Sequence, residues 1–228
     1  WEVPVMVQRL CGICPVSHHI AASKAMDVIV GARKLTPTAE KIRRLMHYGQ
    51  MMQSHALHFF HLCSPDLLFG FDSDITRRNI VGVAQEHPEV ARQGVLLRKF
   101  GQEVIRVTAG KRIHGTGSVP GGVNKSLTVA ERDGLLKDIY AMIGWARDAV
   151  HLIQKVHMQD PGLYNSFGIF RSNFMSLVGH DGDLDFYHGT LRTRDDNGKL
   201  IFDGVDYQDY DKYIVEEVKP WSYMKFPY

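Results

Sequence analysis

The sequence predicts a mainly α protein, a bundle of long helices with a small β-hairpin region near its C-terminal end. Apolar residues recur at steps of three and four, the period of an amphipathic helix. These segments are long, roughly 20 to 28 residues against a mean near 11 or 12, and they lack heptad regularity, which favours a bundle over a coiled coil. After Asp160-Pro161-Gly162 the helical pattern stops, and glycines and aromatic residues become frequent.

The ends of the chain differ from those of a complete protein. It opens with WEVPVMVQRL, which lacks an initiator methionine and predicts a strand, and it closes on KPWSYMKFPY. We therefore expect an internal piece of a longer chain. Within it, we expect residues 1–163 to form a helical portion and residues 164–228 a mixed α/β portion of one domain.

The first predicted helix runs from Pro15 to a stop at Gly31. Proline is favoured at the first helical position, and glycine often ends a helix. One face carries small residues at steps of 4, 3 and 4, namely His18, Ala22, Ala25 and Ile29. We expect this face to pack closely against a neighbouring helix. His19 points away from it and is expected at the surface or at an interface.

Three further helices follow from the same periodicity. The first two span residues 38–62 and 89–108. The third begins at a T-x-x-E capping box, Thr128 to Glu131, and its apolar stripe continues as one helix through Leu136, Ile139, Ile143, Ala146, Val150 and Ile153. Near the C-terminal end, TLRTRDDNGKLIF predicts a hairpin of two short strands around residues 195–198.

Composition excludes several classes of protein. The chain is 44% hydrophobic and 23% charged, with a net charge of +2, too small for a nucleic-acid or membrane-surface footprint. No apolar run approaches the roughly 18 residues of a membrane span. Three cysteines, an odd number, argue against a disulfide framework and for a reducing compartment.

The stretch RLCGICPVSHH, residues 9–19, places Cys11 and Cys14 three apart at the start of the first helix. The positive end of a helix lowers a thiol pKa, which favours metal binding or nucleophilic attack. His18 lies one turn after Cys14 and can donate a hydrogen bond to its sulfur. Four interpretations remain open on spacing alone: a redox pair, half of a zinc site, half of a larger metal site, or two inert cysteines.

The flanking residues carry a resemblance. Arg9, Cys11, Gly12, Cys14 and His18 match the pattern R-x-C-G-x-C-x-x-x-H, which resembles the N-terminal metal motif of the large, catalytic subunit of nickel–iron hydrogenases. HGTGSVPGG, residues 114–122, is similar to the family's second landmark, a histidine followed by P-G-G. HHIAASKAMD and QSHALHFFHL are similar to the soluble, NAD-reducing (bidirectional) branch.

The resemblance implies roles for individual residues. Cys11 would be a terminal nickel ligand and Cys14 would bridge nickel and iron. His18 would hydrogen-bond near the bridging sulfur, and Arg9 would shape the charge at the site. The loop that contains His114, Pro120, Gly121 and Gly122 would lie close to the cofactor and to the small subunit.

The resemblance also implies an activity, cofactors and partners. The activity would be heterolytic cleavage or formation of dihydrogen at a nickel–iron centre whose iron carries cyanide and carbonyl ligands. Electrons would pass to iron–sulfur clusters in a small subunit, then through diaphorase-type subunits to NAD, in the cytoplasm. The glycines of the 114–122 loop match no Rossmann or P-loop spacing, so NAD would bind elsewhere in the complex.

The sequence departs from the family pattern in two ways. The family's second C-x-x-C and its upstream acidic residue are missing, so the chain carries half of a site and is expected to be inactive alone. Two rival interpretations remain: a non-enzymatic, complex I-type relative, which lacks metal cysteines, and a zinc-stabilised interaction protein.

The remaining histidines and the third cysteine have structural interpretations. Four histidines are expected in bundle or interface roles, namely His47, His55, His58 and His61, because no cysteine or carboxylate lies at ligand spacing from them. Cys63 ends an apolar stripe and is expected to be a small core residue.

Overall fold

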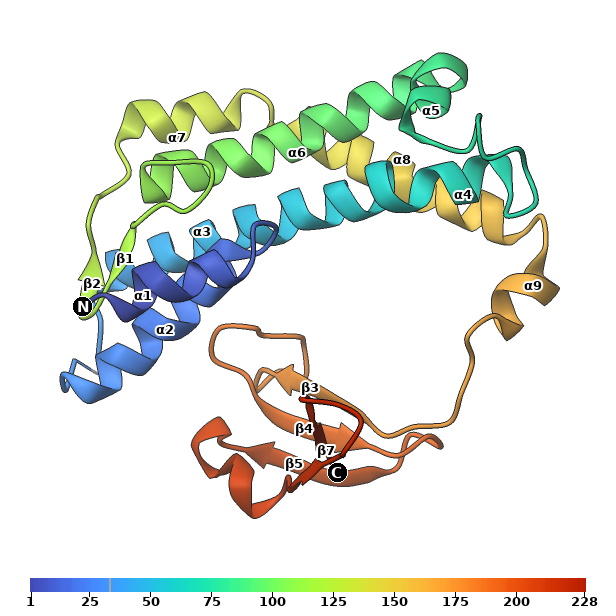
Figure 1. The fold of residues 1–228 in the computed structure, drawn as a ribbon. Helices are drawn as coiled ribbons and strands as arrows, with labels where there is room; N and C mark the ends of the chain where they lie inside the picture. Colours follow the sequence, from blue (N-terminus) through green and yellow to red (C-terminus); the bar gives the residue numbers. More distant parts are fainter. Residues whose placement is uncertain (33) are drawn as a thin grey trace. The chain divides into compact units, whose positions relative to one another are not determined.

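The computed structural model describes residues 1–32 and 34–228. It divides into two compact units, Trp1–Pro161 and Gly162–Tyr228, which are drawn in Figure 1 from blue to yellow and from yellow to red. The first unit is helical and the second contains the larger β-sheet. That both units belong to one domain stays a prediction.

The chain begins with helix, not with the predicted strand. Residues Val3–Met6 form a short helix, α1, and Val7–Leu10 a 3₁₀ turn, η1. Pro4 lies in the first turn of α1, where its missing N–H has no hydrogen bond to lose. The strand prediction was wrong because this segment packs against α2 (Pro15–Ile29) as helical turns that bury Pro4 and Gln8, and no strand pairs with it in the described part of the chain.

The long helices lie where the periodicity predicts them. They are α2, α3 (Pro37–Leu57) and α6 (Pro88–Ala109). Gly31, with φ +77°, follows the end of α2 as expected. The sequence did not predict two short helices between α3 and α6, α4 (Ser64–Phe69) and α5 (Ile80–Glu86). None of the helices in the described residues is both long and apolar enough to cross a membrane.

Helices α3 and α6 lie side by side and form the centre of the first unit (Figure 1). Their close approach depends on glycine, because a Cβ at Gly101 would lie 2.7 Å from both the backbone nitrogen of Gln53 and the carbonyl oxygen of Gly49. The most completely buried apolar side chains include Met46 on α3 and Ile105 on α6. The two helices therefore form one rigid support for α2, which packs on α3.

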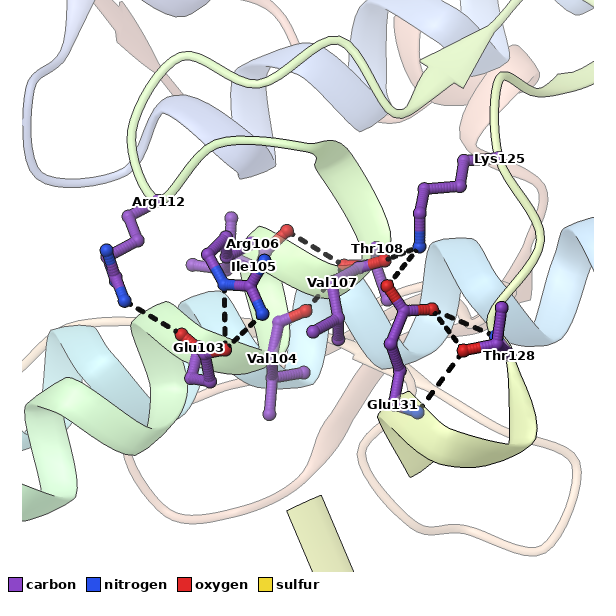
Figure 2. Close-up of polar contacts among 10 residues, drawn as sticks. All are labelled: Glu103, Val104, Ile105, Arg106, Val107, Thr108, Arg112, Lys125, Thr128 and Glu131. Atoms are coloured by element: carbon purple, nitrogen blue, oxygen red, sulfur yellow. Dashed lines mark hydrogen bonds and ion pairs between the residues drawn. The ribbon is translucent and has the colours of Figure 1, made fainter. Parts of the chain in front are cut away.

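The fourth predicted helix is two helices. α7 (Val129–Leu136) and α8 (Ile139–His157) are separated by a turn at residues 137–138. The predicted capping box is present, with Thr128 and Glu131 bonded to each other's backbone. Lys125 Nζ bonds both Glu131 and the carbonyl of Val107 at the end of α6 (Figure 2).

These contacts explain the break between α7 and α8. The hydrogen bond from Lys125 is the largest cause that lowers the pKa of Glu131 to about 2, so this carboxylate is ionised near neutral pH and holds α7 at the end of α6. Met142 of α8 packs with Leu97 and Phe60 elsewhere in the bundle. A turn at residues 137–138 lets both sets of contacts form, so the prediction of one continuous helix was wrong.

A two-stranded hairpin joins α6 to α7. Strands β1 (Ser118–Val119) and β2 (Gly122–Val123) pair antiparallel, and Gly121 in the turn has φ +86°, a conformation that favours glycine. The sequence did not predict these strands. β1 contacts α2 and β2 contacts α3, so the hairpin covers part of the helix that follows the cysteines.

The second unit contains the predicted hairpin. Strands β4 (Thr190–Arg194) and β5 (Leu200–Val205) flank the turn, in which Asp195 accepts backbone hydrogen bonds from Asn197 and Lys199. The structure adds an antiparallel edge strand, β3 (Phe174–Val178), and a separate pair, β6 (Glu216–Val218) and β7 (Lys225–Pro227). A short helix, α9 (Pro161–Ser166), begins at the boundary between the units, and a 3₁₀ turn, η3 (Tyr207–Lys212), follows β5.

Candidate metal centre

Cys11 and Cys14 face each other across the short loop between η1 and α2. The backbone of Cys11 is extended, and Cys14 is the residue before the first turn of α2. Their sulfurs are 2.7 Å apart, and the backbone N–H of Cys14 donates to the sulfur of Cys11 over 3.1 Å. Both cysteines are free and half-buried. The sulfurs therefore point to a common position without the covalent bond of a disulfide, which would be about 2.03–2.05 Å long.

His18 completes a three-residue cluster with the two cysteines. One ring nitrogen and the two sulfurs all lie within 4.8 Å of one another. Across residues 1–32 and 34–228, this is the one group of three or more histidine, cysteine or acidic side chains with such spacing. The structure therefore places His18 beside the cysteines, and its predicted role at a metal stays a prediction. Arg9 lies in η1 with an exposed side chain, two residues before Cys11.

The two thiols are not equivalent. The Cys14 thiol donates to Cys11, and this hydrogen bond lowers the pKa of Cys11, helped by the backbone N–H of Cys14. The same bond, together with burial, raises the pKa of Cys14. The lowered thiol pKa expected at the start of the helix is therefore found at Cys11 and not at Cys14 in the metal-free pair. A metal ion that binds both sulfurs must displace the Cys14 proton.

The buried face of α2 is the one opposite to the predicted face. His19 is 1% exposed, with Nδ1 2.7 Å from the carbonyl oxygen of Pro4 and Nε2 3.1 Å from the backbone nitrogen of Ser118. A carbonyl only accepts and an N–H only donates, so the ring is neutral and protonated on Nδ1. The surface role predicted for His19 was wrong, because α1 and the β1–β2 hairpin cover its side of the helix. Ile29, on the predicted buried face, is 74% exposed.

The β1–β2 hairpin is held at the other end of α2. Asp27 accepts from the backbone N–H of Gly121 over 2.7 Å, while Arg43 donates to the carbonyls of Gly122 and Val119 over 3.1 and 2.6 Å. Asp27 is 13 residues beyond Cys14, roughly 20 Å along the helix axis at 1.5 Å per residue. The structure therefore does not bring Pro120, Gly121 and Gly122 together with the cysteines, and their predicted contact with a small subunit stays a prediction.

His114 lies in the loop that leads to this hairpin. It has a left-handed backbone conformation, φ 53°, and its Nε2 atom is buried with no hydrogen-bond partner among the described residues. The neighbouring Gly115 packs against Ala109 at the end of α6 so closely that a Cβ would lie 2.6 Å from the Ala109 side chain. The loop thus folds back on α6, and the role of His114 at a cofactor stays a prediction.

Comparison with known proteins decides the family. The model of the nickel-dependent hydrogenase family matches residues 1–70. The β subunit of the NAD-reducing hydrogenase HoxS of Cupriavidus necator is 44% identical over 100% of this chain and 49% of its own length. A vhu subunit of the F420-non-reducing hydrogenase of Methanocaldococcus jannaschii is also 44% identical, over 100% of this chain and 54% of its own. This chain belongs to the nickel-dependent hydrogenase family.

Solved structures agree with this assignment. An NAD⁺-reducing nickel–iron hydrogenase in the H2-reduced state is 56% identical, with a TM-score of 0.96 over 100% of this chain and 51% of that one. A nickel–iron–selenium hydrogenase from Desulfomicrobium baculatum, 21% identical with a TM-score of 0.74, shares the fold. The resemblance carried by the Arg9 to His18 motif is therefore confirmed. This chain spans about half the length of the curated relatives it matches.

The region that matches the family model also contains an unpredicted Cys–His pair. Residues His58–Cys63, η2, form a π-helical turn, which brings residues five apart onto one face. The sulfur of Cys63 lies 3.4 Å from Nε2 of His58. The sequence did not predict this pair, because regular α-helical spacing places residues five apart on different faces. Cys63 is half-buried, not a core residue, and burial raises the pKa of its thiol.

Proposed function

We propose that this chain supplies the first two cysteine ligands of the nickel–iron centre in a dihydrogen-activating hydrogenase subunit. Cys11 would bind nickel and Cys14 would bridge nickel and iron. The observation that carries the proposal is the convergence of the Cys11 and Cys14 sulfurs with a ring nitrogen of His18 at the start of α2. Two soft sulfur donors that point to one position fit a thiophilic metal, and they leave further coordination positions for other ligands.

The chain's own residues prepare the site in three ways. The backbone N–H of Cys14, directly before α2, donates to the sulfur of Cys11 and helps to lower the pKa of that thiol. A ring nitrogen of His18 lies within 4.8 Å of both sulfurs, so His18 could orient a ligand held by the cysteines or tune its basicity. Arg9 adds positive charge two residues before Cys11. When bound, the metal centre polarises dihydrogen so that a base can remove a proton.

The proposal includes partners and an electron acceptor. The chain has three cysteines, too few for the pair and a four-cysteine iron–sulfur cluster together. The electrons would therefore pass to iron–sulfur clusters in a small subunit. The similarity to NAD-reducing enzymes supports further transfer to NAD through diaphorase-type subunits. We propose the cytoplasm as the compartment, because three free cysteines suit a reducing environment.

Metal analysis of matched cysteine variants tests the ligand assignment. Cys14→Ser in the complete hydrogenase complex is expected to abolish nickel–iron assembly, because a serine oxygen is a poor substitute for a soft bridging thiolate. Cys63→Ser is the control, since Cys63 lies outside the cluster. Nickel and iron are measured by elemental analysis, and the iron-bound cyanide and carbonyl by infrared spectroscopy.

The results separate the proposal from its rivals. Nickel and iron in the wild type and in Cys63→Ser, with neither in Cys14→Ser, support the ligand role. Full nickel occupancy and dihydrogen uptake in Cys14→Ser would refute it. Zinc alone in the wild type would favour a zinc-stabilised interaction protein, and the absence of any metal would favour a complex I-type relative.

A further inference from the structure

Two glutamine side chains of α3 converge on one backbone carbonyl inside the C-x-x-C loop. Nε2 of Gln50 lies 2.8 Å, and Nε2 of Gln53 2.7 Å, from the carbonyl oxygen of Ile13. Gln50 is 2% exposed and Gln53 5% exposed. A carbonyl oxygen has two lone pairs, so the pair of donors satisfies it fully. Rotation of this carbonyl would break two buried hydrogen bonds.

The same peptide group contacts the metal-ligating sulfur. The Ile13 carbonyl and the Cys14 N–H belong to one planar trans peptide unit, so they point in opposite directions and turn together. The N–H of this unit donates to the sulfur of Cys11 over 3.1 Å. By holding the carbonyl, the glutamines therefore orient the N–H toward Cys11 and fix where Cys14 leaves the loop.

Core packing does not account for these two amides. The Ile13 side chain is 49% exposed, so the glutamines contact its backbone instead of completing an apolar cluster around it. Oε1 of Gln50 is buried with no hydrogen-bond partner in the described part of the chain. An unpaired buried acceptor destabilises a fold. Turning the amide around would instead place Oε1 against the carbonyl oxygen, so its present orientation serves Ile13.

The support beneath the glutamines is rigid. Gly101 of α6 approaches the backbone of Gln53 so closely that no Cβ fits between them. One turn earlier on α3, Nε2 of His47 lies 3.2 Å from the hydroxyl of Ser17 in the first turn of α2. α3 is thus fixed against α6 on one side and against the start of α2 on the other.

We propose that Gln50 and Gln53 are positioning residues that set the spacing of the Cys11 and Cys14 sulfurs through the Ile13–Cys14 peptide. The spacing itself is a property of the protein without metal. Its consequence for a nickel–iron centre rests on the proposed function. Two measurements therefore separate the parts, one on the metal-free protein and one on the assembled enzyme.

The first measurement is the equilibrium of the Cys11–Cys14 dithiol with glutathione in the full subunit produced without nickel, with Cys63 and every other cysteine of the subunit outside the pair replaced by serine. The pair transfers two electrons to oxidised glutathione, forming one disulfide and two molecules of reduced glutathione. Substitution of both Gln50 and Gln53 by Met keeps side-chain length and removes both donors. We expect the effective concentration of the two thiols to fall roughly tenfold, because each lost hydrogen bond contributes a factor of a few.

Controls keep this test decisive. Gln154→Met, on the exposed side of α8, is the matched control and is expected to leave the equilibrium unchanged. Circular dichroism verifies the fold of each variant. If the double variant does not fold, the single Gln53→Met, which keeps the bond from Gln50, is measured and is expected to lower the effective concentration roughly threefold. A folded variant with the wild-type equilibrium overturns the proposal.

The second measurement is the infrared spectrum of the assembled complex. Loosening the loop should shift the cyanide and carbonyl bands of the iron in the double Met variant, an effect that a purely structural role for the glutamines does not produce. Unshifted bands in a fully loaded variant contradict positioning at the metal. A changed thiol equilibrium in a protein that binds no nickel even as wild type would preserve the positioning role and refute the proposed function.

Discussion

Nη1 of Arg43 lies 2.6 Å from Oδ2 of Asp27, and the two side chains are 0% and 9% exposed. This buried ion pair joins α2 to α3, and both partners also bind the β1–β2 hairpin through Gly121 and Gly122. The pair therefore fixes the two helices that carry the cysteine loop and its glutamine support. The hydrogen bonds of Asp27 and Arg43 to the hairpin backbone also hold the P-G-G turn against α2 and α3.

Removal of one partner of this pair should destabilise the protein strongly. Asp27→Ala leaves the Arg43 charge buried without compensation, which typically costs about 3–5 kcal/mol. The change in the free energy of unfolding is measured by urea titration. Glu89→Ala, which breaks the exposed pair with Arg92, is the control and should have little effect. Equal effects of the two substitutions would contradict the structural role of the buried pair.

Stability should decrease as the pH falls below the ordinary pKa of histidine. Burial is the largest cause that lowers the pKa of His19 in the folded protein, so below about pH 6.5 the unfolded chain takes up a proton that the folded one does not. The contribution of neutral His19 to the free energy of unfolding is therefore complete above about pH 6.5 and is lost as the pH falls toward the folded-state pKa. Burial also lowers the pKa of His47, which adds to the loss of stability at low pH.

Urea titrations at pH 7.5 and 5.5 check this expectation. His19→Gln should reduce the difference in unfolding free energy between the two pH values, because it removes one of the groups that bind protons differently in the two states. His180→Gln, at an exposed position of the second unit, is the control and should retain the wild-type difference. A difference that is the same in all three proteins would show that His19 takes no part.

Two glycine substitutions should have opposite effects. Gly101→Ala places a Cβ against the backbone of α3, and overpacking of this kind costs about 1–3 kcal/mol. In Gly144→Ala, on α8, the added Cβ meets no atom within 4 Å, and alanine stabilises a helix interior by up to about 1 kcal/mol relative to glycine. Thermal melts compare the two. Stabilisation by Gly101→Ala would mean that α3 and α6 are farther apart than described.

The sequence predicted the long helices because their apolar stripes lie next to recognisable end signals. Pro15 begins α2, Gly31 follows its end, and the Thr128 capping box begins α7. It predicted the wrong buried face of α2 because that face depends on what packs there. α1 and the β1–β2 hairpin cover His19, and the sequence predicted neither element. The turn at residues 137–138 depends in the same way on contacts from distant segments, those of Lys125 and Met142.

The candidate site shows a similar division. Cys11, Cys14 and His18 were predictable because their positions lie within one loop and one helical turn. Gln50 and Gln53 were not, because they act on a backbone carbonyl 37 and 40 residues away. Their sequence signal is two amides three residues apart on the face of α3 that also carries Ile42, Met46 and Ala56. The π-helical turn that joins His58 to Cys63 has no comparable signal.

The most direct test of the ligand assignment examines the metal neighbours of the sulfur position in residue 14. Selenocysteine is introduced in place of Cys14 in the complete hydrogenase complex, and X-ray absorption is measured at the selenium edge. We expect two metal neighbours, nickel and iron, around this selenium, and one, nickel, when selenocysteine replaces Cys11 instead. A selenium atom at position 14 with no metal neighbour, in a complex that holds nickel and iron, would contradict the assignment.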